Sequence, residues 1–230
     1  MALSSSKKNS QTNSSITANS VTPEIDGISV DCVIFGFKKE SLEVLLVQHA
    51  GGESEGSWGL LGGWLKKEES SDDAAQRILY ELTSLDNIYL EQLKAFTNPE
   101  RVLERRVVTI GYYTLVNRED YNIKASLRVI EAKWYKISEI PDLIFDHNEI
   151  LDFSLSQLRN RVRQAPIGFN LLPAKFTLLQ LLELYEAILS KELDKRNFIS
   201  KINSLEILNK LDEKDMQSSR KGSYLYTFNK

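Results

Sequence analysis

The chain has 230 residues, of which 42% are hydrophobic and 27% charged, with a net charge of -3. These values fit a globular protein of one large or two small domains, and they exclude a general attraction to nucleic acid, so any such role needs a local basic patch. The single cysteine excludes an internal disulfide, and with no apolar run of about 18 residues and no visible signal peptide we expect a cytoplasmic protein without a membrane segment.

The N-terminal part divides into a polar tail and a hairpin. Residues 1–24 are rich in Ser, Asn, Thr and Gln, and they are predicted to be a disordered tail. From residue 25, two apolar runs at 28–37 and 42–48 are separated by a charged turn, which predicts a β-hairpin. Cys32 lies in the first run, so we expect a buried structural thiol.

The stretch from residue 59 to 85 predicts a strand, a glycine-containing loop and a helix. Gly62 and Gly63 end a strand-like run. The N-cap and first-turn chemistry of the helix can come from Ser70, Ser71, Asp72 and Asp73. Apolar residues recur along it at helical spacing, at Ala75, Ile78, Leu79, Leu82 and Leu85.

This segment resembles the Nudix box, G-x5-E-x7-R-E-U-x-E-E-x-G-U, in which U is a bulky aliphatic residue. The matching positions are Gly63, Glu69, Arg77, Leu79, Glu81 and Leu85. Ile78 and Leu82 stand where two helix glutamates belong, and Ser84 replaces the last glycine.

The departures bear on catalysis. In the family, helix carboxylates hold Mg²⁺ or Mn²⁺ against a diphosphate, and such hard cations need clustered oxygen ligands. Glu81 alone is a poor site. We therefore expect a box that keeps the fold without catalysis, with no catalytic residue, no metal and no cofactor. The alternative is a Nudix hydrolase acting on ADP-ribose or a related nucleoside diphosphate derivative.

Further strands are predicted at 88–96, 105–116 and 132–137, followed by a helix over 146–163. Asp146 is a candidate N-cap for this helix, and His147 is expected to be a first-turn surface residue. Strands on both sides of one central helix, with a second helix to follow, predict an α/β/α sandwich over residues 25–163.

The composition changes after residue 163. Residues 164–176 contain two prolines and predict a packed linker, and residues 177–230 predict two helices and a hairpin. Thr177 and Asp194 can cap the helices, and Phe198, Ile202 and Leu205 form the apolar stripe of the second. This layout is that of a winged helix-turn-helix. The residues predicted to contact DNA are Lys195, Arg196, Asn197, Ser200, Lys201 and Ser204 of the second helix and Arg220 and Lys221 at the hairpin tip.

The order of these parts resembles the Nudix-related transcriptional regulators over about residues 26–230. The C-terminal matches are the runs at 170–173, 176–178, 184–188 and 194–198. The resemblance implies a Nudix domain that senses a ligand, a winged helix that binds operator DNA, and a homodimer on a palindrome. One branch senses ADP-ribose and another L-arabinose. The runs at 144–147 and 166–170, and the lost box glutamates, look closer to the arabinose branch.

We therefore predict a repressor of sugar utilisation that responds to a pentose, with ADP-ribose as the second choice of effector. The resemblance implies that the candidate effector-binding residues flank the position of the substrate cleft of Nudix hydrolases. They are Trp58, Trp64, Glu81 and Arg106. A ligand that favours the DNA-incompetent arrangement would release the operator. A third alternative is a non-enzymatic adaptor that binds protein partners.

Overall fold

A computed structural model describes residues 25–229 except 39, 52–54, 87, 119–122, 124–128, 165–170 and 217–221. Three predictions fall outside this set: the N-terminal tail over 1–24, residues 165–170 of the predicted linker, and Arg220 and Lys221 at the hairpin tip.

The N-terminal domain is built on a sheet whose centre is the predicted hairpin. Strands β1 (Gly27–Lys38) and β2 (Ser41–His49) pair antiparallel, with Lys38 opposite Ser41. Glu40, in the turn, has a φ of 63°. The hairpin prediction is confirmed, and Cys32 is buried as expected.

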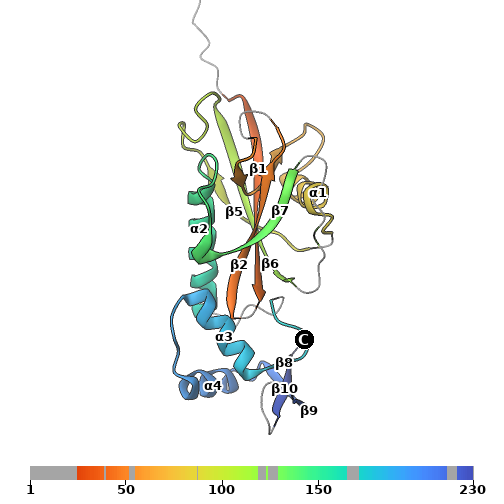
Figure 1. Ribbon diagram of the computed structural model, residues 1–230, viewed down its shortest axis with the longest axis vertical. Coiled ribbons are helices and arrows are strands. Elements are labelled where there is room, and N and C mark those ends of the chain that lie inside the picture. Colours follow the sequence, from red (N-terminus) through yellow and green to blue (C-terminus); the bar gives the residue numbers. More distant parts are fainter. Residues whose placement is uncertain are drawn as a thin grey trace, which may run out of the picture.

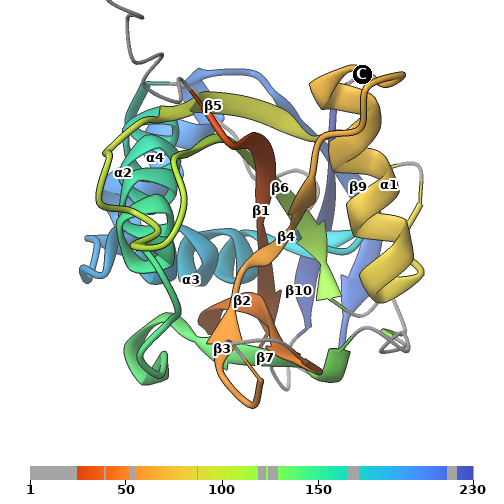
Figure 2. The same ribbon diagram turned by 90° about the horizontal axis from the view of Figure 1, so that it is seen from above.

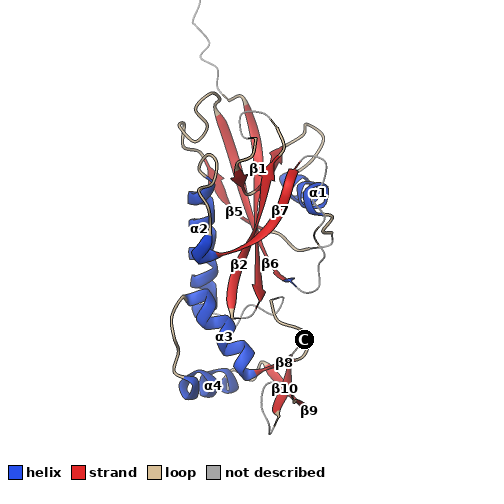
Figure 3. Cartoon of the chain, viewed as in Figure 1, coloured by secondary structure: helices blue, strands red, loops and turns tan. Residues whose placement is uncertain are grey.

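Five further strands complete this sheet (Figures 1 and 3). Its order is β3-β2-β1-β6-β5, with β4 also paired to β1 and β7 to β2, and only β1 and β6 run parallel. The strands are β3 (Trp58–Gly59), β4 (Leu61–Trp64), β5 (Glu91–Phe96), β6 (Val107–Asn117) and β7 (Val129–Lys136).

Helices α1 (Ser71–Thr83) and α2 (His147–Gln164) cover opposite faces of the sheet (Figure 2). A short 3-10 helix, Ile137–Glu139, follows β7. Because side chains alternate along a strand, Val30, Cys32 and Ile34 of β1 belong to the core under α1, whereas Val33 and Phe35 belong to the core under α2. The predicted sandwich of two helices around a sheet is confirmed.

The C-terminal part is a winged helix. Its elements are β8 (Phe176–Thr177), α3 (Leu178–Leu189), α4 (Lys195–Ser204), β9 (Leu208–Asp215) and β10 (Ser223–Phe228), and its small sheet has the order β8-β10-β9. Thr177 and Asp194 cap α3 and α4 as predicted, since their side chains accept from Gln180 N and Asn197 N. Leu205 differs from prediction: it follows the end of α4 and is 43% exposed.

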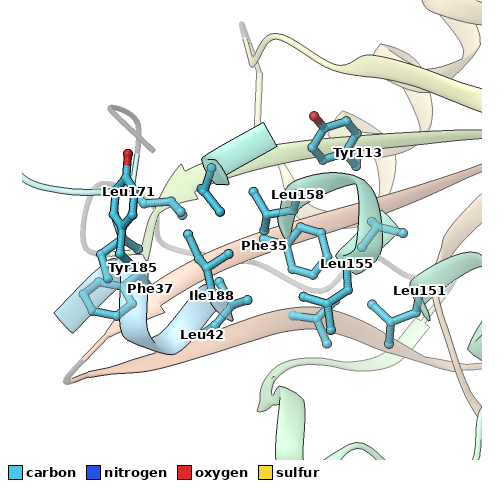
Figure 4. Packing of buried hydrophobic residues seen from close by; sticks show 14 of the residues in the cluster. Phe35, Phe37, Leu42, Tyr113, Leu151, Leu155, Leu158, Leu171, Tyr185 and Ile188 are labelled. Carbon is cyan, nitrogen blue, oxygen red and sulfur yellow. The ribbon is translucent and has the colours of Figure 1, made fainter. Parts of the chain in front are cut away.

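One hydrophobic core joins the two domains. Phe35 and Phe37 of β1 belong to the same buried cluster as Leu158 of α2 and Tyr185 and Ile188 of α3, and Figure 4 shows these side chains packed together. The C-terminal end of the predicted linker contributes to it as well, through the buried residues Leu171, Leu172 and Phe176. The linker is therefore packed, as expected, where it is described.

Among the helices of the described residues, none combines the length and the apolar character that a membrane span would require.

Candidate functional site

Helix α1 begins with local hydrogen bonds that the sequence predicts. Ser70 accepts from the backbone N–H of Asp73, and the Asp73 carboxylate accepts from the Ser70 N–H, which forms a capping box. One turn later, the Arg77 guanidinium donates to both carboxylate oxygens of Glu69, at 2.8 and 2.6 Å, and to the Trp64 carbonyl oxygen at 3.0 Å. These bonds tie the loop before the helix to the helix.

The hydrogen bonds from Arg77 lower the pKa of Glu69 to about 2, despite an opposing contribution from desolvation. Glu81 lies 3.3 Å from Arg77 and 3.9 Å from Lys66. Two of the glutamate positions of the box are apolar and buried: Ile78 is 2% exposed, and Leu82 is 6% exposed. The Ile78 side chain packs directly under Gly63, since its Cδ1 would lie 3.2 Å from a Cβ at that position.

The last box position keeps the conformation of a glycine. Ser84 ends α1 with a φ of 61°, in the left-handed region, and its N–H donates to Tyr80 O. Across the described part of the chain, no three His, Cys, Asp or Glu side chains gather into a group that could hold a metal ion. The α1 face thus keeps the shape of the box while packing aliphatic side chains at two of its ligand positions.

Three of the four predicted effector-binding residues, Trp64, Glu81 and Arg106, are linked through shared neighbours, and Trp58 lies apart from them. Trp64 lies against Gly27, where a Cβ would be 2.7 Å from its ring, and Arg106 is close by, because its N–H donates to Asp26. Arg77 connects Glu81 to Trp64, because it donates to the Glu81 carboxylate and to the Trp64 carbonyl oxygen. Trp58 belongs to the core on the α2 face and meets Tyr135 edge-on at 5.0 Å.

A second polar group lies on the α2 face of the sheet, and we call it the α2-side polar cluster: His49, Asp31, Arg101, Asp146 and His147. The Arg101 side chain is 2% exposed, and it donates to both Asp146 oxygens at 2.9 and 2.7 Å and to Asp31 at 3.4 Å. His147 accepts from the Leu60 N–H through Nδ1 at 3.0 Å, and its Nε2 lies 3.5 Å from Asp31.

The electrostatics of the cluster follow from burial. Desolvation alone would raise the pKa of Asp31, but His147 and Arg101 outweigh it and hold that pKa below its usual value. Desolvation lowers the pKa of His49, with a further lowering from His147 that Asp31 partly offsets. Nε2 of His49 is buried and has no hydrogen-bond partner within the described ranges.

The cluster corrects two predictions. His147 is not a surface residue, since it is 4% exposed, and Asp146 binds Arg101 in addition to preceding the helix. Sequence reasoning missed Arg101 altogether and gave Asp31 no role. One signal was available: Asp31 is a charged residue inside an otherwise apolar strand, and such residues are rarely buried without a partner.

Phe145 stands beside this cluster. It is 52% exposed, its ring meets the His147 ring edge-on at 5.6 Å, and its φ is 53°. A left-handed backbone is uncommon for a bulky residue, and such strain tends to gather at functional positions.

Helix α4 presents the predicted polar surface. Phe198 and Ile202 are buried against α3, while the side chains of the predicted DNA-contacting set on this helix are exposed. That set is Lys195, Arg196, Asn197, Ser200, Lys201 and Ser204. All six helical candidates are therefore accessible in the structure.

The wing adds basic residues that the sequence analysis did not single out. Lys210 and Lys214 of β9 lie over the Tyr224 ring of β10, at 3.5 and 4.7 Å from its centroid. Their spacing in the chain was the available signal, because residues two and four apart share one face of a strand.

Comparison with known proteins decides the family. Residues 26–153 match the NUDIX domain family, and residues 168–228 match the NrtR DNA-binding winged helix domain. The chain belongs to the Nudix family. Its fold, an α+β Nudix domain followed by a winged helix, is the predicted one.

Named relatives cover nearly the whole chain. The ADPR responsive transcriptional repressor NtrR of Acinetobacter baylyi is 29% identical over 87% of this chain and 81% of its own. The crystal structure of Shewanella oneidensis NrtR is 26% identical with a TM-score of 0.73, covering 88% of this chain and 94% of that one, and a structure of that protein with a 27mer DNA matches equally well.

The NUDIX domain of Shewanella oneidensis NrtR, complexed with ADP ribose, is 28% identical with a TM-score of 0.54 and covers 62% of this chain and 94% of that one. These relatives are NrtR proteins, so the predicted placement beside the arabinose-responsive branch is not supported.

Proposed function

We propose that this protein is a ligand-responsive transcriptional repressor that binds operator DNA through its winged helix. The observation that carries the proposal is the surface of α4, where six polar and basic side chains are exposed on the second helix of a domain that matches the NrtR DNA-binding winged helix. Such a helix fits the major groove, where Arg reads guanine and Asn reads adenine. Lys210 and Lys214 on the wing are placed to meet backbone phosphates.

The proposed effector is ADP-ribose, bound in the Nudix domain. The support is the relative from Acinetobacter baylyi, which is named as ADPR responsive, and the NUDIX domain solved with ADP ribose. A free pentose such as L-arabinose is the second candidate. The support for a pentose is the α2-side polar cluster, and no named relative supports it.

The Nudix domain is proposed to bind without hydrolysis. Ile78 and Leu82 occupy two of the three helix glutamate positions of the box and are buried in the core under α1. Aliphatic side chains offer no oxygen ligand, and Glu81 alone gives a divalent cation one carboxylate where it requires several.

Coupling between the domains is proposed to run through α2. Its side chains share a core with α3, and Arg159 of α2 donates to the Ile188 carbonyl at 2.9 Å and to the Ser190 hydroxyl at 2.8 Å at the end of α3. A shift of α2 would therefore move the winged helix. A tenfold loss of DNA affinity needs only about 1.4 kcal/mol of differential ligand binding.

The test is a gel-shift and fluorescence-anisotropy titration of the full-length protein against duplexes from upstream of its own gene and neighbouring operons. We expect binding that weakens with salt, a loss of about tenfold or more in Arg196→Ala, and release by ADP-ribose. Lys67→Ala removes an exposed positive charge from the Nudix domain and is the matched control, expected to bind like the wild type.

Size-exclusion chromatography with the bound duplex tests the expected homodimer. Failure to bind any duplex at low ionic strength would overturn the repressor proposal. Turnover of ADP-ribose with Mg²⁺ at enzymatic rates, abolished in Glu81→Gln, would establish the hydrolase in place of the non-hydrolytic sensor.

A further inference from the structure

We infer that the α2-side polar cluster, and not the Nudix-box face, binds the sugar hydroxyl groups of the effector. This inference rests on the proposed function in one respect, namely that the protein has an effector. It goes further by naming the face of the sheet, the residues and the chemical group that they recognise.

The side chains of the cluster suit neighbouring hydroxyl groups. Carboxylates accept hydrogen bonds from two adjacent O–H groups, and a guanidinium donates to hydroxyl oxygens in a fixed plane. Asp31 and Asp146 supply the carboxylates, and Arg101 bridges them in the structure. A bound sugar would share these hydrogen bonds while the charges remain paired.

An unused polar atom borders the cluster. Nε2 of His49 and Nδ1 of His147 each lie 3.0 Å from the position that a Cβ on Gly59 would take, so the two rings approach one another across that glycine. Nδ1 of His147 already accepts from Leu60, whereas Nε2 of His49 has no partner among the residues described. Buried polar atoms without a partner are costly, and a ligand hydroxyl would satisfy this one.

An aromatic side chain stands at the edge of the cluster. Phe145 is exposed, touches His147 edge-on, and has a left-handed backbone that its side chain does not favour. The apolar C–H face of a sugar ring can lie against such a ring. The backbone strain at Phe145 is then part of the site, because it places the aromatic next to the carboxylates.

Charge selects the kind of group. The two carboxylates of the cluster, Asp31 and Asp146, outnumber its one guanidinium, that of Arg101. That excess repels phosphate and admits a neutral hydroxylated group. Two sources share this chemistry, a free pentose and the terminal ribose of ADP-ribose.

The position of the cluster also connects it to the DNA-binding domain. Asp146 immediately precedes α2, His147 begins it, and Arg159 near its other end binds the end of α3. A sugar that contacts the first turn of α2 therefore acts on the helix that leads to the winged helix.

Isothermal titration calorimetry on the full-length protein tests the inference, with D-ribose, L-arabinose and ADP-ribose as separate probes. Binding by a free pentose identifies that source, and binding by ADP-ribose alone identifies the terminal ribose. Binding by none, in a protein that still binds its duplex, overturns the inference and leaves the repressor proposal in place. Failure to bind DNA overturns the repressor proposal instead.

Two variants locate the site. Phe145→Asn removes the aromatic ring but suits a left-handed backbone, so the unliganded melting temperature should hold or rise while the affinity for the probe falls about tenfold. Glu81→Gln removes a carboxylate from the Nudix-box face and should leave the affinity within twofold of the wild type. The reverse pattern, with loss in Glu81→Gln and none in Phe145→Asn, would place the ligand on the α1 face and refute the inference.

A third variant tests the carboxylates directly. Asp146→Asn keeps the shape and one acceptor oxygen but removes the charge, and we expect at least tenfold weaker binding of the probe. DNA binding without ligand serves as the check on folding. If Asp146→Asn binds the probe as the wild type does while retaining DNA binding, the carboxylate has no part in recognition and the inference fails.

Discussion

The two faces of the Nudix sheet carry charge in opposite ways. On the α1 face, Glu69, Arg77 and Glu81 pair near the surface, and the positions beneath them are aliphatic. On the α2 face, Asp31 and Arg101 are buried under a loop and a helix. The fold has kept charged groups on both sides; the Arg77 and Glu69 side chains remain 19% and 13% exposed, whereas those of Arg101 and Asp31 are 2% and 6% exposed.

This difference separates two roles for the same types of residue. Pairs near the surface contribute little to stability, because water screens them and the side chains lose freedom. Buried ions must be paired, because each lost partner leaves an uncompensated charge in a medium of low polarity. The α1 face is therefore expected to tolerate substitution and the α2 face is not, and four measurements test this contrast.

The largest effect is expected from Arg101→Met. The substitution leaves Asp31 and Asp146 without their shared cation, so the free energy of unfolding should fall by about 3–5 kcal/mol. Urea denaturation measures it. Lys66→Met on the α1 face is the control, expected to change stability by less than about 1 kcal/mol because that pair is 3.9 Å apart and exposed. Equal losses would erase the proposed contrast.

Ile78→Glu restores a glutamate of the box. Because Ile78 is buried in the core under α1, the new carboxylate should destabilise the fold by about 2–3 kcal/mol, and added Mg²⁺ should bring no hydrolysis of ADP-ribose. Ile78→Val, the control, should cost about 1 kcal/mol. A fold that tolerates the glutamate and hydrolyses ADP-ribose would show that the α1 face remains a catalytic surface.

Acid should weaken both faces. The pKa of Glu69 is about 2 in the folded protein, below its ordinary value, so its stabilising effect is complete above about pH 4.5 and disappears as the pH falls toward 2. Asp31 has the same sign, since its folded pKa is also lowered. Melting temperatures from pH 6 to 2 should fall less steeply in Glu69→Gln; an unchanged slope would show that the Arg77 pair does not contribute.

The smallest effect is expected from Ser84→Gly, which restores the last glycine of the box. Ser84 has a left-handed backbone, so glycine should raise the free energy of unfolding by about 0.5–1 kcal/mol. Ser84→Ala, which keeps a Cβ, should bring no gain. Thermal denaturation compares the two, and a loss in Ser84→Gly would mean that the serine hydroxyl matters more than the backbone.

Local patterns carried most of the fold prediction. The hairpin, the capping of α1 by Ser70 and the caps of α3 and α4 are set by residues within a few positions of one another. The bounds of the strands were predicted less accurately. Strand β5 begins at Glu91 and not near 88, and β7 (Val129–Lys136) begins three residues before the predicted start at 132.

Long-range assembly could not be predicted. The Arg101 contacts with Asp31 and Asp146 join residues 70 and 45 positions apart, so neither periodicity nor spacing reveals them. The same holds for His147, whose Nδ1 accepts from the N–H of Leu60, a residue 87 positions away between β3 and β4. The six residues of α4 were predicted as a group because they are polar residues of one helix, whose apolar residues Phe198 and Ile202 lie four positions apart and are buried.

The continuous packing from Phe35 through Leu158 to Tyr185 makes the Nudix domain and the winged helix a single cooperative unit. Cutting the chain after α2 would expose the apolar side chains of α3 to water, so the isolated winged helix should be insoluble. Both domains should unfold in one thermal transition, so a ligand that binds one domain should raise the melting temperature of the other as well. An operator fragment would then act as a thermal stabiliser of a sheet that it never touches.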